Sequence, residues 1–339
     1  MRKLASIRKI INIRPIEGAD MIEVATVDNW NVVVKKNEFR IGDFVIYFEI
    51  DSLLPIIPEF EFLRKSSYKK MANGTEGFRL RTIKLRGQIS QGLIASVSLL
   101  TKFPNSGALK EGDDVSEILG VIKYEPPIPA ELSGVVIGPI PPYIQKTDEE
   151  RIQNLTSEYE IYKKYKFFAS EKMDGTSTTI FLHDDVFGVC GRNWQYEYNP
   201  DNTYWKIAIQ LNLEEKMKFF GRNLAIQGEI IGEGIQDNKY KLIGQKLLVF
   251  NIFDIDKHEY FSKEDMLDIC DKFNLETVPT IYVNFTLTEM VDELLLLADG
   301  ISILNSNTLR EGLVWVSIDS TKRISFKTIS NKFLLKYGI

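Results

Sequence analysis

Half of the prolines in this chain lie in one short stretch. Six of the twelve fall within residues 126–145, including Pro126-Pro127 and Pro139-Ile-Pro-Pro142. Proline fixes its own φ angle and has no backbone N–H, so such a stretch is expected to be a stiff, extended connector. A chain of 339 residues is long enough for two domains with separate cores. We therefore expect a domain over 1–125, a linker over 126–145 and a second domain over 146–339.

The first part of the chain has the pattern of a small all-β domain. Runs rich in Ile, Val, Phe and Tyr alternate with turns containing Gly, Asp, Asn or Pro. The runs occupy residues 4–13, 22–27, 31–35, 44–50, 78–85 and 92–97. Their number and spacing predict an OB-fold, a β-barrel whose open face binds oligonucleotides. A barrel that serves only as structural support would show the same pattern.

One part of this domain has the composition of an RNA-binding surface. Residues 78–87 interleave four cations with apolar residues, and residues 64–70 form a basic segment with a tyrosine. The four cations are Arg79, Arg81, Lys84 and Arg86. Cations pair with phosphates and aromatic rings stack on bases, although a solvated charged face has a similar composition. The formal net charge is −5, so any RNA-binding surface must be local.

The second part of the chain mixes helices with strands. Residues 147–150 pair a threonine cap with three acids, which predicts a helix that runs to about residue 166 and carries Arg151. Apolar spacing predicts further helices and strands, which we interpret as scaffold except where noted below. The expected helices are 204–220, 262–273 and 286–298, and the expected strands are 178–183, 185–190, 224–235, 247–254 and 323–334.

Between the linker and these strands lies a lysine paired with an acid. Within residues 169–181, Lys172 and Asp174 are two positions apart, so on an extended chain their side chains point the same way. Gly175 allows a sharp turn or the close approach of a ligand. A lysine with a lowered pKa can act as a covalent nucleophile while the acid holds a metal ion. A surface ion pair beside a turn is the other interpretation of these residues.

Glu171-Lys172-Met-Asp-Gly175 resembles the nucleophile motif of the covalent nucleotidyltransferases, which include polynucleotide ligases and mRNA capping enzymes. The later motifs of that superfamily have counterparts here, in the same order. They are Gly191-Arg192-Asn-Trp194, Gly228-Glu229, the strand ending Phe253-Asp254, Glu311-Gly-Leu-Val314 and Lys327. Each match alone is weak evidence for this superfamily, but the whole set in the expected order is strong evidence.

The N-terminal part narrows the resemblance. Residues 16–27, 42–45 and 85–94 are similar to the OB module of tRNA-binding proteins and to the N-terminal module of the Deinococcus/Naegleria-type RNA ligases. Only this ligase type places an OB module before the nucleotidyltransferase domain. The resemblance implies an α+β chain, with an N-terminal OB-fold β-barrel followed by an ATP-grasp-like adenylylation domain of antiparallel sheets with flanking helices.

By this resemblance, the chain is expected to be an ATP-dependent RNA ligase that uses Mg²⁺ or Mn²⁺. Lys172 would attack the α-phosphorus of ATP to form lysyl-AMP; AMP would pass to an RNA 5′-phosphate, and an RNA 3′-hydroxyl would displace it. Asp174, Glu229 and Glu311 would hold the metal ion through water, and Lys327 would contact the α-phosphate. Further nucleotide-binding candidates are Glu171, Arg192, Arg151, Arg323 and Phe253. Phe253 would stack on the purine, and Phe250 is the second candidate for that stacking role.

One position departs from this assignment, and one further acid is left without a role. Many RNA ligases have a second lysine two residues before the one matched by Lys327, and Ser325 stands there in this chain. Glu233 lies on the same predicted strand face as Glu229, and we expect it to be peripheral.

Other functions remain open on the sequence. A capping-type guanylyltransferase shares the lysine chemistry but should have its OB module after the catalytic domain. An NAD-dependent ligase would need a four-cysteine zinc module, and the chain has only Cys190 and Cys270. A non-catalytic RNA-binding protein with a decayed transferase domain is the third alternative.

The expected partner is RNA with 3′-hydroxyl and 5′-phosphate ends, either single-stranded or in a nicked duplex, with no obligatory protein partner. Two cysteines and no apolar run of 18 residues indicate an intracellular protein without a membrane span.

Overall fold

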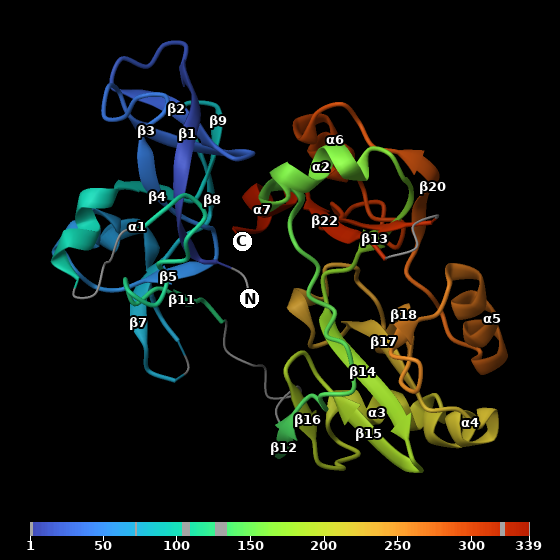
Figure 1. Cartoon of the computed structure of the whole chain (residues 1–339). Helices are drawn as coiled ribbons and strands as arrows, with labels where there is room; N and C mark the ends of the chain where they lie inside the picture. Colours follow the sequence, from blue (N-terminus) through green and yellow to red (C-terminus); the bar gives the residue numbers. More distant parts are fainter. Residues whose placement is uncertain (1–2, 72, 104–108, 126–133, 319–322, 339) are drawn as a thin grey trace.

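The computed structural model describes residues 3–71, 73–103, 109–125, 134–318 and 323–338. Two parts follow one another along the chain (Figure 1). The first half of the predicted linker, with Pro126-Pro127 and Pro129, lies outside the described residues. In its second half, β12 (Val136–Pro139) pairs with β16 (Trp194–Tyr196), and Ile140 is buried. The end of the proline-rich stretch therefore packs on the second domain.

The N-terminal part is built around a curled antiparallel sheet, which confirms the predicted OB-fold. Its five strands are ordered β10-β4-β1-β2-β3, and β9 lies against β3. They are β1 (Ala5–Pro15), β2 (Ile22–Val27), β3 (Trp30–Lys35), β4 (Phe44–Phe48) and β10 (Leu93–Ser96). Smaller elements are β5 (Ser52–Leu54), α1 (Arg64–Ser67), β6 (Tyr68–Lys70), β7 (Glu76–Arg79), β8 (Thr82–Leu85), β9 (Gln88–Gln91) and β11 (Ile122–Lys123). Apolar side chains form cores on both faces of the sheet.

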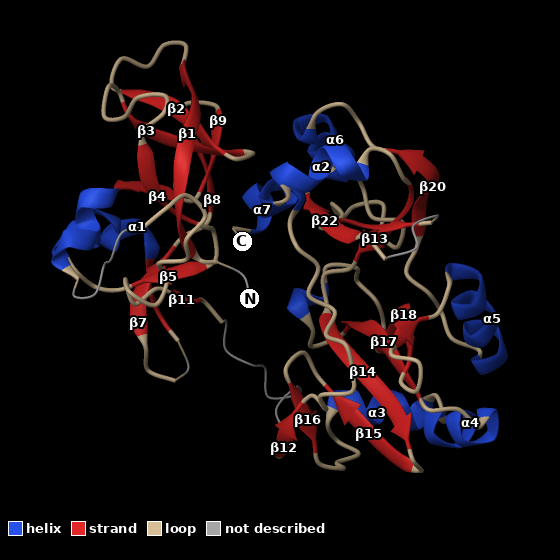
Figure 2. Cartoon of the chain, in the orientation of Figure 1, coloured by secondary structure: helices blue, strands red, loops and turns tan. Residues whose placement is uncertain are grey.

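The C-terminal part contains two antiparallel sheets with helices beside them, as the predicted α+β class requires (Figure 2). The larger sheet is ordered β12-β16-β15-β14-β17-β18-β19, and the smaller one β20-β13-β21-β22. Strands not yet given are β13 (Lys166–Lys172), β14 (Thr176–His183), β15 (Val186–Cys190), β17 (Leu224–Gly232), β18 (Gln245–Asp254), β19 (Glu259–Tyr260), β20 (Thr280–Thr286), β21 (Gly312–Ser317) and β22 (Ser325–Ile329). The helices are α2 (Thr156–Tyr162), α3 (Thr203–Gln210), α4 (Leu213–Phe220), α5 (Lys263–Phe273), α6 (Val291–Ala298) and α7 (Asn331–Tyr337).

Several predicted elements are wrong, and the structure shows a physical reason for each. The helix expected from residue 147 does not begin there, because Asp148 and Glu149 pair with cations of the second domain and Arg151 is extended. The helix expected over 204–220 breaks at Asn212, which has a left-handed φ of 51°. The helix expected over 286–298 begins only at Val291, because residues up to Thr286 belong to β20.

Two predicted strands are also shorter than expected. The run over 323–334 ends as a strand at Ile329, and Ser330 then caps α7 by accepting from the N–H of Phe333. The run over 78–85 divides into β7 and β8, which belong to different sheets. The break falls at Leu80, whose backbone pairs with Ser52 and Asp51 instead of continuing one ladder.

The two parts of the chain meet through both apolar and polar contacts. Ile329 and Leu334 join Trp30 in one buried cluster, so the last strand and helix complete a core of the OB-fold. Trp30 Nε1 also donates to Asn154 Oδ1 at 2.7 Å, and Asn154 Nδ2 donates to Glu49 Oε1 at 2.9 Å. Figure 1 shows α7 on the side of the second domain that faces the first. This seam holds the OB-fold beside the smaller sheet.

No helix in the described ranges is both long and apolar enough to cross a membrane.

Candidate active site

The proposed nucleophile ends the central strand of the smaller sheet. β13 lies between β20 and β21, and its last residue, Lys172, pairs with Gly312 of β21. Glu311 directly precedes that strand, so strand register brings its carboxylate to the lysine. Lys172 Nζ donates to Glu311 Oε2 at 2.7 Å, which joins two residues 139 positions apart in the sequence. The structure thus brings the first and fifth predicted motifs together.

Two further acids reach the same place from other elements. Asp174 lies in the turn between β13 and β14, and Glu229 lies on β17, opposite Ser177 of β14. Gly175 allows this turn to lie against β17. A Cβ at residue 175 would be 2.4 Å from the Ile230 carbonyl oxygen and 2.8 Å from Glu229 Cγ. Any side chain at this position would therefore push the turn away from Glu229.

The charged groups of this cluster shift one another's pKa values. Burial lowers the pKa of Lys172, but nearby carboxylates, Glu311 first, outweigh it and raise the pKa above its usual value. Burial raises the pKa of Asp174 to about 6, and the charge of Glu311 adds to that rise. Burial also raises the pKa of Glu229 to about 8, although Lys172 opposes the shift. The carboxyl groups of the cluster are therefore not fully neutralised by the cations around them.

A hydrated divalent cation fits this arrangement. Such an ion would supply the missing positive charge, and Mg²⁺ prefers oxygen ligands while retaining several of its waters. Within the part of the chain that the structure describes, no three His, Cys, Asp or Glu side chains are grouped closely enough to chelate a metal directly. The resemblance implies that Asp174, Glu229 and Glu311 hold the ion through its water shell, and such an arrangement needs no direct chelating group.

The predicted phosphate-binding cations are held by acids from one segment. Lys327 Nζ on β22 lies 3.6 Å from Asp148 Oδ1, and Arg192 after β15 lies 3.4 Å from the same carboxylate. The Asp148 side chain is 63 % exposed, and the partial desolvation that raises its pKa is outweighed by the charges of Lys327 and Arg192, which leave the pKa below its usual value. Asp148 thus lies between two cations that the sequence assigns to the nucleotide.

Arg323 lies beside the serine that replaces the expected second lysine. Its Nη1 donates to Ser325 Oγ at 2.7 Å and lies 3.3 Å from Glu149 Oε1, while its guanidinium lies 4.3 Å from the centre of the Tyr260 ring. The Ser325 hydroxyl in turn donates to Glu149. A guanidinium is therefore present next to position 325 even though a lysine is absent.

Arg151 is placed differently from the expectation. It is not on a helix; it forms a parallel bridge with Lys327, whose N–H donates to the neighbouring Glu150 carbonyl at 2.8 Å. The Arg151 side chain is 7 % exposed, lies 4.0 Å from Asp51 Oδ2 and stands over the Trp30 ring at 5.8 Å. It therefore lies at the seam between the OB-fold and the strand of Lys327.

The remaining nucleotide candidates lie away from the lysine. Glu171 is buried on the opposite side of β13, where its Oε2 accepts from the Ile303 N–H at 2.9 Å. Phe253 is 2 % exposed and packs against Tyr260 in a buried cluster. The second choice, Phe250, is only partly buried. Glu233 is exposed, in keeping with the peripheral position expected for it.

The four predicted RNA-binding cations fall into two pairs. Arg79 pairs with Asp51 at 3.0 Å and lies over the Tyr124 ring, and Arg81 donates to the Gly338 carbonyl at 3.5 Å. Lys84 and Arg86 are exposed, on β8 and in the turn that joins it to β9. Only the second pair extends into solvent.

Sequence reasoning assigned no role to Lys239 and Tyr240, yet both touch Asp174. Lys239 Nζ lies 2.6 Å from Asp174 Oδ2, and the Tyr240 hydroxyl accepts from the Asp174 N–H at 2.7 Å. They lie in the polar loop between β17 and β18, which matches no motif. Proximity in the fold was the only signal that could reveal them.

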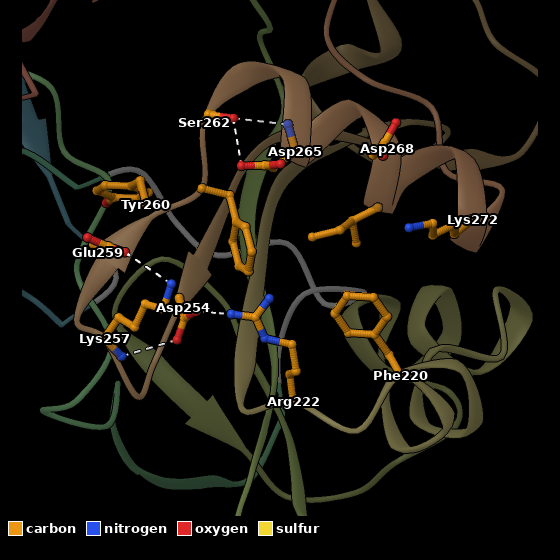
Figure 3. A pocket seen from close by; sticks show the side chains of 12 residues that line it. Phe220, Arg222, Asp254, Lys257, Glu259, Tyr260, Ser262, Asp265, Asp268 and Lys272 are labelled. Atoms are coloured by element: carbon orange, nitrogen blue, oxygen red, sulfur yellow. Dashed lines mark hydrogen bonds and ion pairs between the residues drawn. The ribbon is translucent and has the colours of Figure 1, made fainter.

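A hollow of about 270 Å³ lies on the outer side of the second domain, between α4, α5 and the end of β18 (Figure 3). Part of its polar lining is paired, as in the Arg222–Asp254 ion pair and the cap that Ser262 forms with Asp265. Lys172, Asp174 and Glu229 are not part of its lining. We assign this hollow no role in the chemistry.

Two family models match different stretches of the chain. A family model described as an OB-fold domain matches residues 4–97, and a family model described as RNA ligase matches residues 165–337. An apo aspartate-to-alanine mutant of Naegleria gruberi RNA ligase is similar over 98 % of this chain and 97 % of that one, with 43 % identity and a TM-score of 0.91.

Two further structures of that protein carry ligands. A lysine-to-methionine mutant of Naegleria gruberi RNA ligase with AMP and Mn matches at 43 % identity, covering 98 % of each chain, with a TM-score of 0.91. A lysine-to-alanine mutant with ATP and Mn matches at 42 % identity over 98 % of each chain, with a TM-score of 0.90. A search of curated proteins gave no match.

Proposed function

Since the chain belongs to the RNA ligase family, we propose that it joins RNA 3′-hydroxyl and 5′-phosphate ends through a lysyl-AMP intermediate on Lys172. The observation that carries this proposal is the grouping of Lys172 with Asp174, Glu229 and Glu311 where the two sheets of the second domain meet. The relatives with ATP, AMP and Mn support an ATP-dependent RNA ligase that uses Mn²⁺ or Mg²⁺.

The first step is a transfer of AMP to the protein. Lys172 Nζ attacks the α-phosphorus of ATP, a P–N bond forms, the bond to the β-phosphate oxygen breaks, and pyrophosphate leaves. The amine must first lose a proton, and Glu311 Oε2, at 2.7 Å, is the nearest acceptor shown. A bound divalent cation supplies positive charge that stabilises the phosphate oxygens and the neutral amine. In free protein the raised pKa keeps Lys172 charged.

Other residues would bind the nucleotide. Lys327 would contact the α-phosphate, and Arg192 would contact a phosphate or the ribose, each giving up its pairing with Asp148. Arg323 and Arg151 would lie near the outer phosphates. Phe253 would stack on the purine and Glu171 would support the pocket; both are buried here, so these two assignments rest on the motif matches.

The later steps need RNA at the same lysine. AMP passes from Lys172 to an RNA 5′-phosphate, and the 3′-hydroxyl of the other end then attacks that phosphate and releases AMP. We propose that residues 1–125 grip the RNA, that 146–339 carry out the chemistry and that 126–145 connect them. Lys84 and Arg86 are the exposed cations best placed to reach phosphates. The free, buried thiols of both cysteines fit an intracellular protein.

Label transfer tests the proposal. Purified protein is incubated with Mg²⁺ and ATP labelled at the α-phosphate, beside labelled GTP, a Lys172→Met variant and the matched control Lys166→Met on the same strand. Wild type and Lys166→Met should retain label from ATP, and Lys172→Met should not. Label from GTP would indicate capping chemistry instead. A protein that binds RNA but is never labelled would leave the non-catalytic alternative.

A further inference from the structure

The loop between β17 and β18 places a second lysine in the acidic cluster. Lys239 Nζ lies 2.6 Å from Asp174 Oδ2, and the two side chains are only 9 % and 11 % exposed. Asp174 is two residues from Lys172 in the sequence, yet its ion pair is with Lys239, whereas Lys172 pairs with Glu311. Each lysine therefore has its own carboxylate.

Lys239 is held from several sides. Its ammonium lies 5.1 Å from the centre of the Tyr337 ring and 5.9 Å from that of Phe333, both on α7. Its carbonyl oxygen accepts from Thr308 Oγ1 at 2.7 Å and from Asn305 Nδ2 at 3.4 Å. The cation thus rests on an aromatic surface, a contact that strengthens when it is shielded from water.

The neighbouring residue fixes the same acid. The Tyr240 hydroxyl accepts from the N–H of Asp174 at 2.7 Å. Two consecutive loop residues thus hold both the main chain and the side chain of Asp174.

The backbone of this loop is strained. Gln236, Asp237, Asn238 and Lys241 have φ values of 45°, 58°, 43° and 54°. Residues other than glycine rarely adopt this left-handed conformation, and it persists only where surrounding contacts impose it. The contacts that Lys239 and Tyr240 make are part of that constraint. The strained backbone of the loop is therefore associated with the position of the Lys239 side chain.

We propose that Lys239 is a positioning residue for adenylylation, which holds the Asp174 carboxylate apart from Lys172 and leaves the nucleophile with Glu311 as its main partner. This inference rests on the function proposed above. Without Lys239, Asp174 would be a nearly buried carboxylate without its cation, and an unpaired buried charge is costly. Lys172 is the other cation in the cluster. Asp174 would turn to it, and the doubly paired amine would reach the α-phosphorus less often.

The variants separate this role from general packing. Lys239→Met removes the charge and keeps much of the side-chain length, whereas Lys239→Arg keeps the charge. The matched control is Lys336→Met, because Lys336 lies 5.2 Å from the same Tyr337 ring but is exposed. Tyr337→Leu alters the aromatic surface and leaves Lys239 in place. Thermal unfolding of each variant reports whether it folds.

The measurement is the single-turnover rate of label transfer from ATP at increasing ATP concentration. For Lys239→Met we expect the rate at saturating ATP to fall about 10- to 100-fold with an apparent KM within about twofold of wild type, because nucleotide binding is not lost. Lys239→Arg should recover most of the rate, and Lys336→Met should match wild type. Tyr337→Leu should be slower by about threefold, which keeps the test informative if Lys239→Met does not fold.

A crystal structure of Lys239→Met gives a readout independent of activity. We expect the Asp174 carboxylate to be within hydrogen-bonding distance of Lys172 Nζ. An unchanged rate, a raised KM at an unchanged rate, or an Asp174 carboxylate that stays in place would each overturn the inference. Wild-type protein that accepts no label would instead overturn the proposed function, so the two failures can be told apart.

Discussion

The charged cluster around Lys172 and the β8–β9 hairpin both carry charges assigned to function, but they place them in opposite surroundings. In the catalytic cluster, defined as Lys172, Asp174, Glu229, Lys239 and Glu311, ion-paired side chains are 9 to 27 % exposed and two acids have raised pKa values. In the hairpin, Lys84 and Arg86 are exposed to solvent. Charges in the cluster depend on one another, whereas those of the hairpin depend mainly on water and salt.

The largest effect should come from Glu229→Gln, because the substitution removes a carboxyl group that would have to ionise in order to hold a divalent cation. We expect adenylylation to slow by about 100-fold or more, because removing a preorganised electrostatic group at a reacting phosphate costs on the order of 10²–10³ in rate. The measurement is single-turnover label transfer from ATP. Glu233→Gln is the matched control, since Glu233 is an exposed glutamate four positions along. Equal, small losses in both variants would contradict the role of the cluster.

The same substitution should stabilise the folded protein at high pH. The folded pKa of Glu229 is about 8 against an ordinary 4.5, so between these values the unfolded chain has released a proton that the folded protein retains. Its contribution to the free energy of unfolding therefore falls as pH rises from about 4.5 to 8. Glu229→Gln should be level with wild type near pH 4.5 and more stable by about 2 kcal/mol or more at pH 8.

Denaturant unfolding at several pH values, without metal or nucleotide, measures this difference. Glu233→Gln should follow wild type throughout. A gap that does not grow with pH would show that the carboxyl group of Glu229 has an ordinary pKa in the folded protein.

The comparison also explains what the sequence could reveal. Lys172 and Glu311 were predictable because a strand end and a strand start carry short motifs, and the OB-fold was predictable from its spaced strands. Lys239 was not predictable, because it reaches Asp174 from a loop 65 residues away.

The segment of Asp148 and Glu149 is predicted as a helix start because acids after a threonine resemble a cap, but in the structure both acids form tertiary ion pairs instead. Helix α7 continues an apolar run that reads as strand, and only its cap at Ser330 marks the change.

An intermediate effect is expected from the hairpin. The double substitution Lys84→Ala/Arg86→Ala should weaken RNA binding about 10-fold at moderate salt and reduce the slope of log affinity against log salt by about 2, one for each phosphate contact. Adenylylation should be unchanged. Lys257→Ala/Lys272→Ala, on the outer hollow of Figure 3, removes the same charge elsewhere and should leave RNA binding unaltered.

Arg79→Ala sharpens this contrast within one domain. Arg79 is paired with Asp51 at 3.0 Å and stacked on Tyr124, so its loss should lower the melting temperature of the protein. A reduced salt slope of RNA binding in Arg79→Ala would contradict this contrast, and so would an unchanged slope in the hairpin variant. Either result would show that RNA binds along Arg79 and Arg81.

The smallest effect is expected from Asp148→Asn, which lies beside Lys327 and Arg192. Asp148 lies 3.6 Å from Lys327 and 3.4 Å from Arg192, and both cations must leave it to contact phosphate. Its side chain is 63 % exposed, so water and salt weaken these ion pairs. Asn should therefore lower the apparent KM for ATP by only about two- to threefold without changing the rate at saturation, and the difference should shrink as salt is added. A raised KM would instead mean that Asp148 orients the two cations for the nucleotide. This exposed acid would then depend on its charged neighbours in the same way as the residues of the buried cluster do.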